Sequence, residues 1–265
     1  MAWTVVDNVA SFFVSGYTGQ IDIRRPDLGL QLQIADATPE NYLAVQFAEP
    51  SRVRASDCYA RVDDLVLMYP QTAQRPFNVQ LQYRLFAGGG RDTRFPQHPD
   101  MPRPMAPGLE TALLVELWIS NYTFALDTNP EVDTRCFTLS DEDAALLQLY
   151  EADGGEGDLS PCATADSDGL SIAAAVLAGR GGRGCDAAAF VHPTDQIDSQ
   201  LLVTGQERGA GESIAVQLRM FGRFMEKGVI RRARVRLLLS PDPIDEQTLA
   251  AHYADFAASP LPLTT

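Results

Sequence analysis

Apolar and polar residues alternate along several long segments of this chain, and this pattern restricts the fold more than any other feature of the sequence. The clearest case is the segment 77–85, FNVQLQYRL, in which every second residue is apolar. A β-strand places successive side chains on opposite faces, so a period of two predicts a strand with one buried face. The same pattern recurs in 113–120, 213–221 and 229–239. The chain is therefore expected to be mainly β.

Shorter strands are predicted between these segments, at 3–6, 12–15, 20–24, 30–34, 42–47, 64–69, 172–177 and 201–204. Most of them are separated by Gly, Pro, Asn or Asp, the residues that favour the tight turns of antiparallel sheets. Strands and helices do not alternate along the chain, which argues against a doubly wound parallel sheet. With 265 residues, the chain is long enough for one large antiparallel β-sandwich domain over 1–265, of which a supersandwich is one form.

Two helices are predicted beside the strands. Near the C-terminus, a run that starts at Pro243 has acidic residues in its first turn, continues to Phe256 and stops at Pro260. A shorter helix is predicted to begin at Ser140, which is a good capping residue. The predicted fold is therefore a β-sandwich with a C-terminal α-helix.

Two segments lack the strand pattern. The segment 87–108 contains three consecutive glycines and five prolines. Because proline has no N–H to donate to a sheet, this segment is the only candidate boundary inside the chain. The segment 151–169 is acidic and rich in glycine, with few apolar residues, and this composition predicts a mobile loop.

The chain is strongly acidic, since 35 Asp and Glu against 21 Lys and Arg give a formal net charge of −14. This charge repels phosphate backbones and anionic lipids, so neither nucleic acids nor membranes are expected as partners. The first residues lack the basic and apolar pattern of a secretion signal, and a cytoplasmic location is expected. In that reducing compartment, Cys58, Cys136, Cys162 and Cys185 are expected to be free thiols.

Three motifs suggest ligand sites, and each has a simpler structural explanation. The segment 179–184 has the spacing of a dinucleotide-binding loop, but Pro193 follows too soon for the required helix. Ser213 lies in an incomplete nucleophile-elbow motif, yet it opens an alternating strand. Alternate oxygen-bearing side chains in 127–133 predict either a metal-binding loop or a solvated turn. No cofactor and no resident metal are predicted, and the role of 127–133 stays open.

The three histidines, His98, His192 and His252, are too far apart in the sequence to form a recognisable ligand set. His98 and His192 each precede a proline and are expected in exposed loops, whereas His252 is expected on the surface or at a cap of the terminal helix. No catalytic residue is predicted, and the sequence leaves open whether the chain is an enzyme.

The most unusual feature is a cluster of basic residues in this acidic chain: Arg223, Lys227, Arg231, Arg232, Arg234 and Arg236. In the strand 229–239, Arg232, Arg234 and Arg236 share one face. Guanidinium groups bind carboxylates and sulfates through paired hydrogen bonds, so this row could form a site for an acidic ligand. The simpler interpretation is that the arginines pair with neighbouring Asp and Glu on an outer face of the sheet.

Two stretches, 64–80 (DLVLMYPQTAQRPFNVQ) and 226–236 (EKGVIRRARVR), resemble segments of an uncharacterised family of bacterial proteins that has no assigned activity. The many long strands and the late arginine-rich strand are also similar to the supersandwich of galactose-mutarotase-like proteins, which handle sugars. That resemblance implies a similar fold and a carbohydrate ligand. The acid and base of that family are typically a glutamate and histidines. His98, His192 and His252 do not match its histidine motif, so the resemblance does not imply mutarotase catalysis.

Two functions from different classes follow from these observations. The first is a non-catalytic or weakly catalytic protein that binds a carbohydrate or an acidic small molecule through Arg232, Arg234, Arg236, Glu116 and Trp118. It predicts that these side chains meet on a concave face of a sheet. The second is a structural or protein-interaction protein without a small-molecule site, which predicts a covered or convex arginine face.

Overall fold

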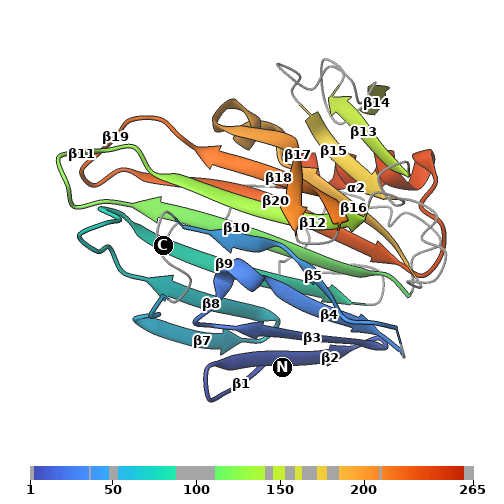
Figure 1. Cartoon of the computed structure of the whole chain (residues 1–265), viewed down its shortest axis with the longest axis horizontal. Coiled ribbons are helices and arrows are strands. Elements are labelled where there is room, and N and C mark those ends of the chain that lie inside the picture. The colour runs from blue at the N-terminus through green and yellow to red at the C-terminus, as the bar shows by residue number, and fades with distance from the viewer. Residues whose placement is uncertain are drawn as a thin grey trace, which may run out of the picture.

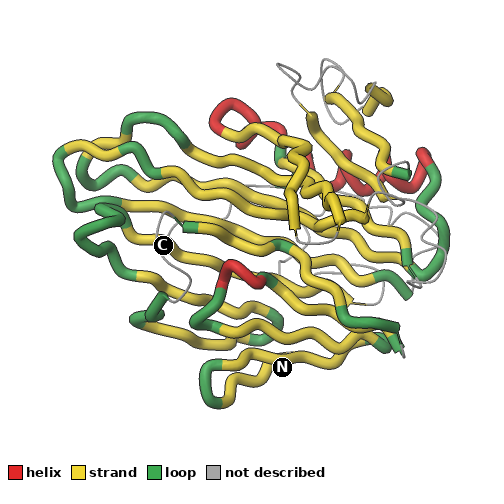
Figure 2. The backbone as a smooth tube through the Cα atoms, viewed as in Figure 1, coloured by secondary structure: helices red, strands yellow, loops and turns green. Residues whose placement is uncertain are grey.

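The computed structural model of the chain describes residues 3–35, 37–47, 53–87, 111–140, 146–152, 159–162, 172–177, 185–208 and 211–259. Strand dominates this backbone, as Figure 2 shows. The strands are β1 (Trp3–Val6), β2 (Val9–Val14), β3 (Tyr17–Asp22), β4 (Leu30–Ile34), β5 (Glu40–Tyr42), β6 (Ala44–Gln46), β7 (Asp57–Arg61), β8 (Asp64–Tyr69), β9 (Asn78–Ala87), β10 (Leu113–Tyr122), β11 (Asp127–Thr128), β12 (Glu131–Ser140), β13 (Leu147–Ala152), β14 (Leu159–Cys162), β15 (Ile172–Leu177), β16 (Asp186–Val191), β17 (Ser199–Arg208), β18 (Gly211–Phe221), β19 (Met225–Glu226) and β20 (Ile230–Ser240). The helical elements are η1 (Pro26–Leu28), η3 (Pro193–Asp198) and α2 (Glu246–Ala257).

The described strands form three large sheets and one short ribbon, and neighbouring strands are antiparallel throughout (Figure 1). The largest sheet has nine strands in the order β14-β13-β15-β16-β20-β10-β9-β8-β7. A five-stranded sheet has the order β1-β2-β3-β4-β5, and a four-stranded sheet has the order β17-β18-β12-β6. The ribbon pairs β11 with β19. The prediction of a mainly β, antiparallel chain is confirmed.

The main hydrophobic core lies between the nine-stranded sheet and the two smaller sheets. Alternate residues of β9, β10 and β20, such as Leu81, Leu117 and Val235, are buried on the inner face of the nine-stranded sheet. Residues of the five-stranded sheet, such as Tyr17, and of the four-stranded sheet, such as Leu218, belong to the same buried cluster. Removing this apolar surface from water is the main stabilising term of a β-sandwich. That the whole chain is one domain stays a prediction.

A single residue, Leu43, divides the second layer into its two sheets. It has a positive φ of 51°, and it separates β5 of the five-stranded sheet from β6 of the four-stranded sheet. The predicted strand 42–47 is therefore two short strands that bend at this point. Gly29, with φ of 73°, lies directly against this bend, since a Cβ at Gly29 would come within 2.3 Å of the Tyr42 carbonyl oxygen. Only glycine fits here without displacing backbone.

The outer face of the nine-stranded sheet carries helix α2. The Asp245 side chain caps the helix by accepting a hydrogen bond from the Thr248 backbone N–H at 2.7 Å. Leu249, Tyr253 and Phe256 lie buried against strand residues of this face in a second hydrophobic cluster. The predicted C-terminal helix is confirmed. It has 12 residues, and no helix in the described part of the chain is long and apolar enough to cross a membrane.

Some predictions made from composition differ from the structure. Ser140 ends β12 and Leu147 begins β13, so the helix predicted from Ser140 has only 141–145 left, which lie outside the described residues. Part of the loop predicted at 151–169 is a strand, because β14 pairs with β13 in an antiparallel hairpin. The segment 87–108, apart from Ala87 at the end of β9, lies outside the described residues, as does 179–184. Ser213 lies in β18, as the alternation predicts.

Candidate functional site

The arginine row lies on the outer face of the nine-stranded sheet, next to α2. Ala233, Val235, Leu237 and Leu239 of β20 belong to the main core, so the alternate residues Arg232, Arg234 and Arg236 point the other way. The register with β10 sets Arg236 opposite Glu116, Arg234 opposite Trp118 and Arg232 opposite Ser120. The sequence-predicted site residues are therefore neighbours on one face. Their role in ligand binding stays a prediction.

Arg236 is buried and is held by two carboxylates. Its Nε and Nη2 donate to the same oxygen, Oε1 of Glu116, at 3.0 and 2.6 Å. Its Nη1 donates to Oδ2 of Asp255 on helix α2, at 2.9 Å, and to the His252 carbonyl oxygen at 3.2 Å. The guanidinium carbon lies 4.6 Å from the centre of the Phe256 ring, within the range of a cation–π contact. Arg236 thus fixes the helix to the sheet.

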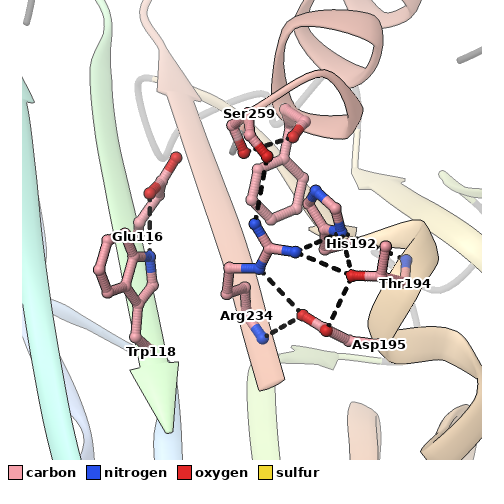
Figure 3. A network of polar contacts seen from close by, with 8 residues as sticks. Glu116, Trp118, His192, Thr194, Asp195, Arg234 and Ser259 are labelled. Atoms are coloured by element: carbon pink, nitrogen blue, oxygen red, sulfur yellow. Dashed lines mark hydrogen bonds and ion pairs between the residues drawn. The ribbon is translucent and has the colours of Figure 1, made fainter. Parts of the chain in front are cut away.

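Arg234 is also buried, within the network drawn in Figure 3. Its Nε donates to Oδ2 of Asp195 at 3.1 Å, and its own backbone N–H donates to the same oxygen at 2.9 Å. Its Nη2 contacts Nδ1 of His192 at 2.6 Å and donates to Oγ1 of Thr194 at 2.9 Å. Nη1 donates to the Ser259 carbonyl oxygen at 3.4 Å. These contacts join β20 to η3 and to the residues that follow α2.

His192 is buried, so its prediction as an exposed loop residue is wrong. It directly follows β16, a strand whose residues are all buried, and its ring packs edge-on against Phe256 at 5.1 Å between centres. Because Arg234 can only donate, Nδ1 of His192 must accept, and the proton of the neutral ring lies on Nε2. Burial, aided by the charge of Arg234, lowers the pKa of His192 to about 4. Burial and Arg236 likewise lower the pKa of His252 to about 4. Both rings are neutral near pH 7.

A row of alternating charges crosses the outer face from β8 to β20. Asp64 lies opposite Arg84, Arg84 opposite Glu116, and Glu116 opposite Arg236. Arg84 donates to both oxygens of Asp64, at 2.7 and 3.1 Å, and both side chains are largely buried. The arginines of this row are therefore compensated by carboxylates from the same sheet, as the simpler interpretation of the sequence predicts.

Trp118 covers part of this row. Its Nε1–H donates to Oε2 of Glu116 at 3.0 Å, and the Arg84 guanidinium carbon lies 4.4 Å from the centre of its ring. Arg84 is buried while Trp118 is half-buried, so the indole lies over the guanidinium and turns its other face away from the sheet. This produces a fixed, outward-facing aromatic surface.

Polar side chains flank the indole on the same face. Gln82 lies opposite Trp118 on β9, and Gln80 lies opposite Ser120. Within the described part of the chain, the side-chain amides of Gln80 and Gln82 form no hydrogen bond, and both residues are half-buried. We name as the binding strip the residues Gln80, Gln82, Trp118, Ser120 and Arg232. The glutamine amides of this strip lie beside an aromatic ring.

The other candidate sites do not assemble. Glu131 and Asp133 from the segment 127–133 both form ion pairs with Arg219, at 3.1 and 3.4 Å. Among the described residues, no group of three His, Cys, Asp or Glu is placed to hold a metal ion. The four cysteines form no disulfide, and burial raises the pKa of the Cys136 thiol to about 12.

Comparison with solved structures gives distant structural likenesses. No family model and no curated protein matches the sequence. Among solved structures, the chain is similar to heparan sulfate lyase HepC from Pedobacter heparinus, with 8% identity over 91% of this chain and 36% of that chain, at a TM-score of 0.47. A mutant of that lyase has 8% identity over 92% of this chain and 37% of that chain, with a TM-score of 0.49. A putative kojibiose phosphorylase from human microbiome has 6% identity over 95% of this chain and 32% of that chain, with a TM-score of 0.36. The chain thus spans about a third of the length of these sugar-processing enzymes.

Proposed function

We propose that this chain is a non-catalytic carbohydrate-binding β-sandwich, and that its ligand rests on the binding strip. The observation that supports this function is the outward face of Trp118, which the Arg84 guanidinium supports from beneath and the unengaged amides of Gln80 and Gln82 flank. The geometry comes from three adjacent strands in fixed register. The platform is therefore preorganised, which lowers the entropic cost of binding.

The chemistry of the strip suits a sugar. A sugar ring has an apolar C–H face that can pack on an indole and hydroxyl groups that both donate and accept hydrogen bonds. Glutamine side chains match those hydroxyls, since each amide offers two donors and an acceptor. Ligand sites generally combine aromatic surface with a few convergent polar groups.

An acidic sugar would find a guanidinium at one end of the strip. Arg234 and Arg236 already bind Asp195, Glu116 and Asp255. Arg232 is half-buried and lies opposite Ser120 on the same face, and we propose that its guanidinium contributes to binding a carboxylate or sulfate group. We assign Glu116, Arg234 and Arg236 an indirect role, in which they hold Trp118 and β20 in place.

The absence of catalysis in this proposal rests on how the carboxylates are engaged. Glycoside hydrolysis ordinarily needs two carboxyl groups on opposite sides of the bond that breaks. Among the described residues, the carboxylates of Asp64 and Glu116 lie next to the strip, and both are held by arginine on the sheet. Because both carboxylates are ion-paired, we propose that the strip binds a sugar without supplying an acid and a base. A cytoplasmic location also stays a prediction.

Fluorescence titration with a panel of neutral and acidic oligosaccharides tests this function. Trp118 is half-buried and the other tryptophan, Trp3, is buried in the core, so a ligand on the strip should change the emission of Trp118 alone. Trp118→Ala should reduce the affinity measured by calorimetry at least about tenfold, equivalent to about 1.4 kcal/mol. Gln20→Ala, which alters an exposed amide on the five-stranded sheet, should leave affinity unchanged. Failure of the parent chain to bind any member of the panel would rule the proposal out.

The buried ion pairs favour a second candidate, a structural or protein-interaction protein without a small-molecule site. Arg234 and Arg236 are covered by η3 and α2, which is the arrangement that this alternative predicts. The same titration separates the two candidates, because a purely structural arginine row gives no sugar-dependent change in Trp118 emission.

A further inference from the structure

Large apolar side chains are exposed together at one end of the molecule, far from helix α2. We name as the apolar tip the residues Phe124, Leu126, Phe224, Val229 and Ile230. Leu126 is 83% exposed and Phe124 is 62% exposed, whereas most residues of their size in this chain are buried. Contiguous exposed apolar groups of this kind mark a surface that contacts another body.

The backbone holds the two segments of the tip together. The Gly228 N–H donates to the Thr123 carbonyl oxygen at 3.1 Å, and β11 pairs with β19. The Arg231 side chain donates to the Phe224 carbonyl oxygen at 2.9 Å. Figure 1 places β11 and β19 at one end of the long axis. The two segments of the tip are therefore held together by backbone contacts at one end of the molecule.

The tip carries positive charge in an acidic chain. Its two segments, 122–130 and 222–232, contain the cations Arg223, Lys227, Arg231 and Arg232 and the anions Asp127 and Glu226. Four cations and two anions give +2, and the remainder carries −16, since the whole chain is −14. Arg223 and Phe224 directly precede β19 and Lys227 directly follows it, and all three residues are exposed. Exposed basic and apolar residues therefore lie close together in the chain at this end of the molecule.

We propose that the apolar tip inserts into an anionic lipid surface. Apolar side chains next to Lys and Arg are the combination that binds the boundary between headgroups and acyl chains. Exposed apolar groups at the end of the molecule suit a deformable lipid layer, because such a layer needs no complementary groove. Two copies of this tip would bring like charges together, which disfavours self-association through it. The proposal shares Arg232 with the binding strip, but it does not require a carbohydrate ligand.

The net charge predicts no membrane partner, and the tip is the local exception to that expectation. At physiological ionic strength the Debye length is about 8 Å, so charges on the distant sheets are largely screened from a surface that touches the tip. The local charge of +2 then determines the interaction. Binding should accordingly weaken at high salt.

Co-sedimentation with vesicles tests this proposal, using phosphatidylcholine alone and phosphatidylcholine mixed with phosphatidylserine. The parent chain should sediment with the anionic vesicles, and the variant Phe124→Ser with Phe224→Ser should bind at least about tenfold more weakly. Phe13→Ser is the matched control, since Phe13 is 74% exposed on β2 of another sheet. Circular dichroism confirms that each variant is folded.

The outcomes are distinct. Equal sedimentation of the parent chain and the double variant overturns the proposal, as does a parent chain that stays in solution with anionic vesicles at low salt. Light scattering provides a further measurement: if the double variant converts an oligomer to a monomer and vesicles bind neither protein, the tip is a protein contact and the lipid assignment is wrong. Retained binding by Phe13→Ser, together with loss in the double variant, supports insertion of the tip.

Discussion

Replacement of Arg236 with methionine should destabilise this protein far more than replacement of an exposed arginine. Glu116 is 4% exposed, and Arg236 donates two hydrogen bonds to its carboxylate. Without the guanidinium, the buried carboxylate keeps the Trp118 N–H as a hydrogen-bond donor but loses its ion pair with Arg236. Breaking a buried ion pair from one side typically costs about 3–5 kcal/mol, and loss of the contact with Asp255 also loosens α2.

The structure predicts an asymmetry between the two partners. In Glu116→Gln, Arg236 keeps Asp255 as a counter-charge, so the free energy of unfolding should fall by only about 1–3 kcal/mol. In the double variant Glu116→Leu with Arg236→Met, both charges are gone and apolar groups fill the space. The double variant should lose less stability than the sum of the single variants Glu116→Leu and Arg236→Met, with a coupling energy of about 1–3 kcal/mol.

Urea unfolding followed by circular dichroism measures these differences. Arg219→Met is the control, because the Arg219 side chain is 49% exposed in its ion pair with Glu131, and its loss should cost at most about 1 kcal/mol. A free energy of unfolding for Arg236→Met within about 1 kcal/mol of the parent value would refute the reasoning. Strict additivity in the double variant would refute it equally, since it would show that the two charges do not interact.

Three further perturbations have defined outcomes. The pKa values of His192 and His252 are about 4 in the folded state and about 6.5 in the unfolded chain, so the unfolded state binds more protons between these pH values. The free energy of unfolding should therefore fall by about 2 kcal/mol per histidine as the pH drops from 6.5 towards 4. Urea midpoints that stay constant over this pH range would contradict this prediction. Gly29→Ala should lower the melting temperature strongly because its Cβ meets backbone at 2.3 Å, whereas Gly16→Ala, which has φ of 83° and open space, should lower it less; equal losses would argue against the close approach. Phe256→Ala should cost about 3–5 kcal/mol and release α2, seen as faster amide exchange in the helix, and protected helix amides would disprove that anchoring role.

The sequence predicted the strands with regular alternation because one of their faces is buried and the other is polar. The predicted bounds of β1, β4, β8 and β15 agree with the structure to the residue. β15 and β16 are each buried on both faces and carry three alanines, so neither shows alternation; β15 was predicted as an apolar run, whereas β16 was missed. β12 was also missed, because its charged and polar residues resemble a turn when its partner strands β18 and β6 are unknown.

The sequence predicted only those features of the candidate site that lie on a single strand. Alternation alone placed Arg232, Arg234 and Arg236 on one face, but it could not identify Asp195 or Asp255 as partners, which lie on η3 and α2. Those contacts depend on how separate elements pack, over separations of 39 and 19 residues. The burial of His192 had one available signal in the sequence, the apolar run of β16 immediately before it.

The bend at Leu43 limits how this protein can vary in length. Side chains on a strand alternate, so β5 and β6 stay in step only while one residue lies between them. Adding or removing a residue at this bend would turn Val45 away from the core and bring a polar neighbour inward. Insertions and deletions between β5 and β6 should therefore destabilise the fold more than a substitution at the exposed residue Asn41.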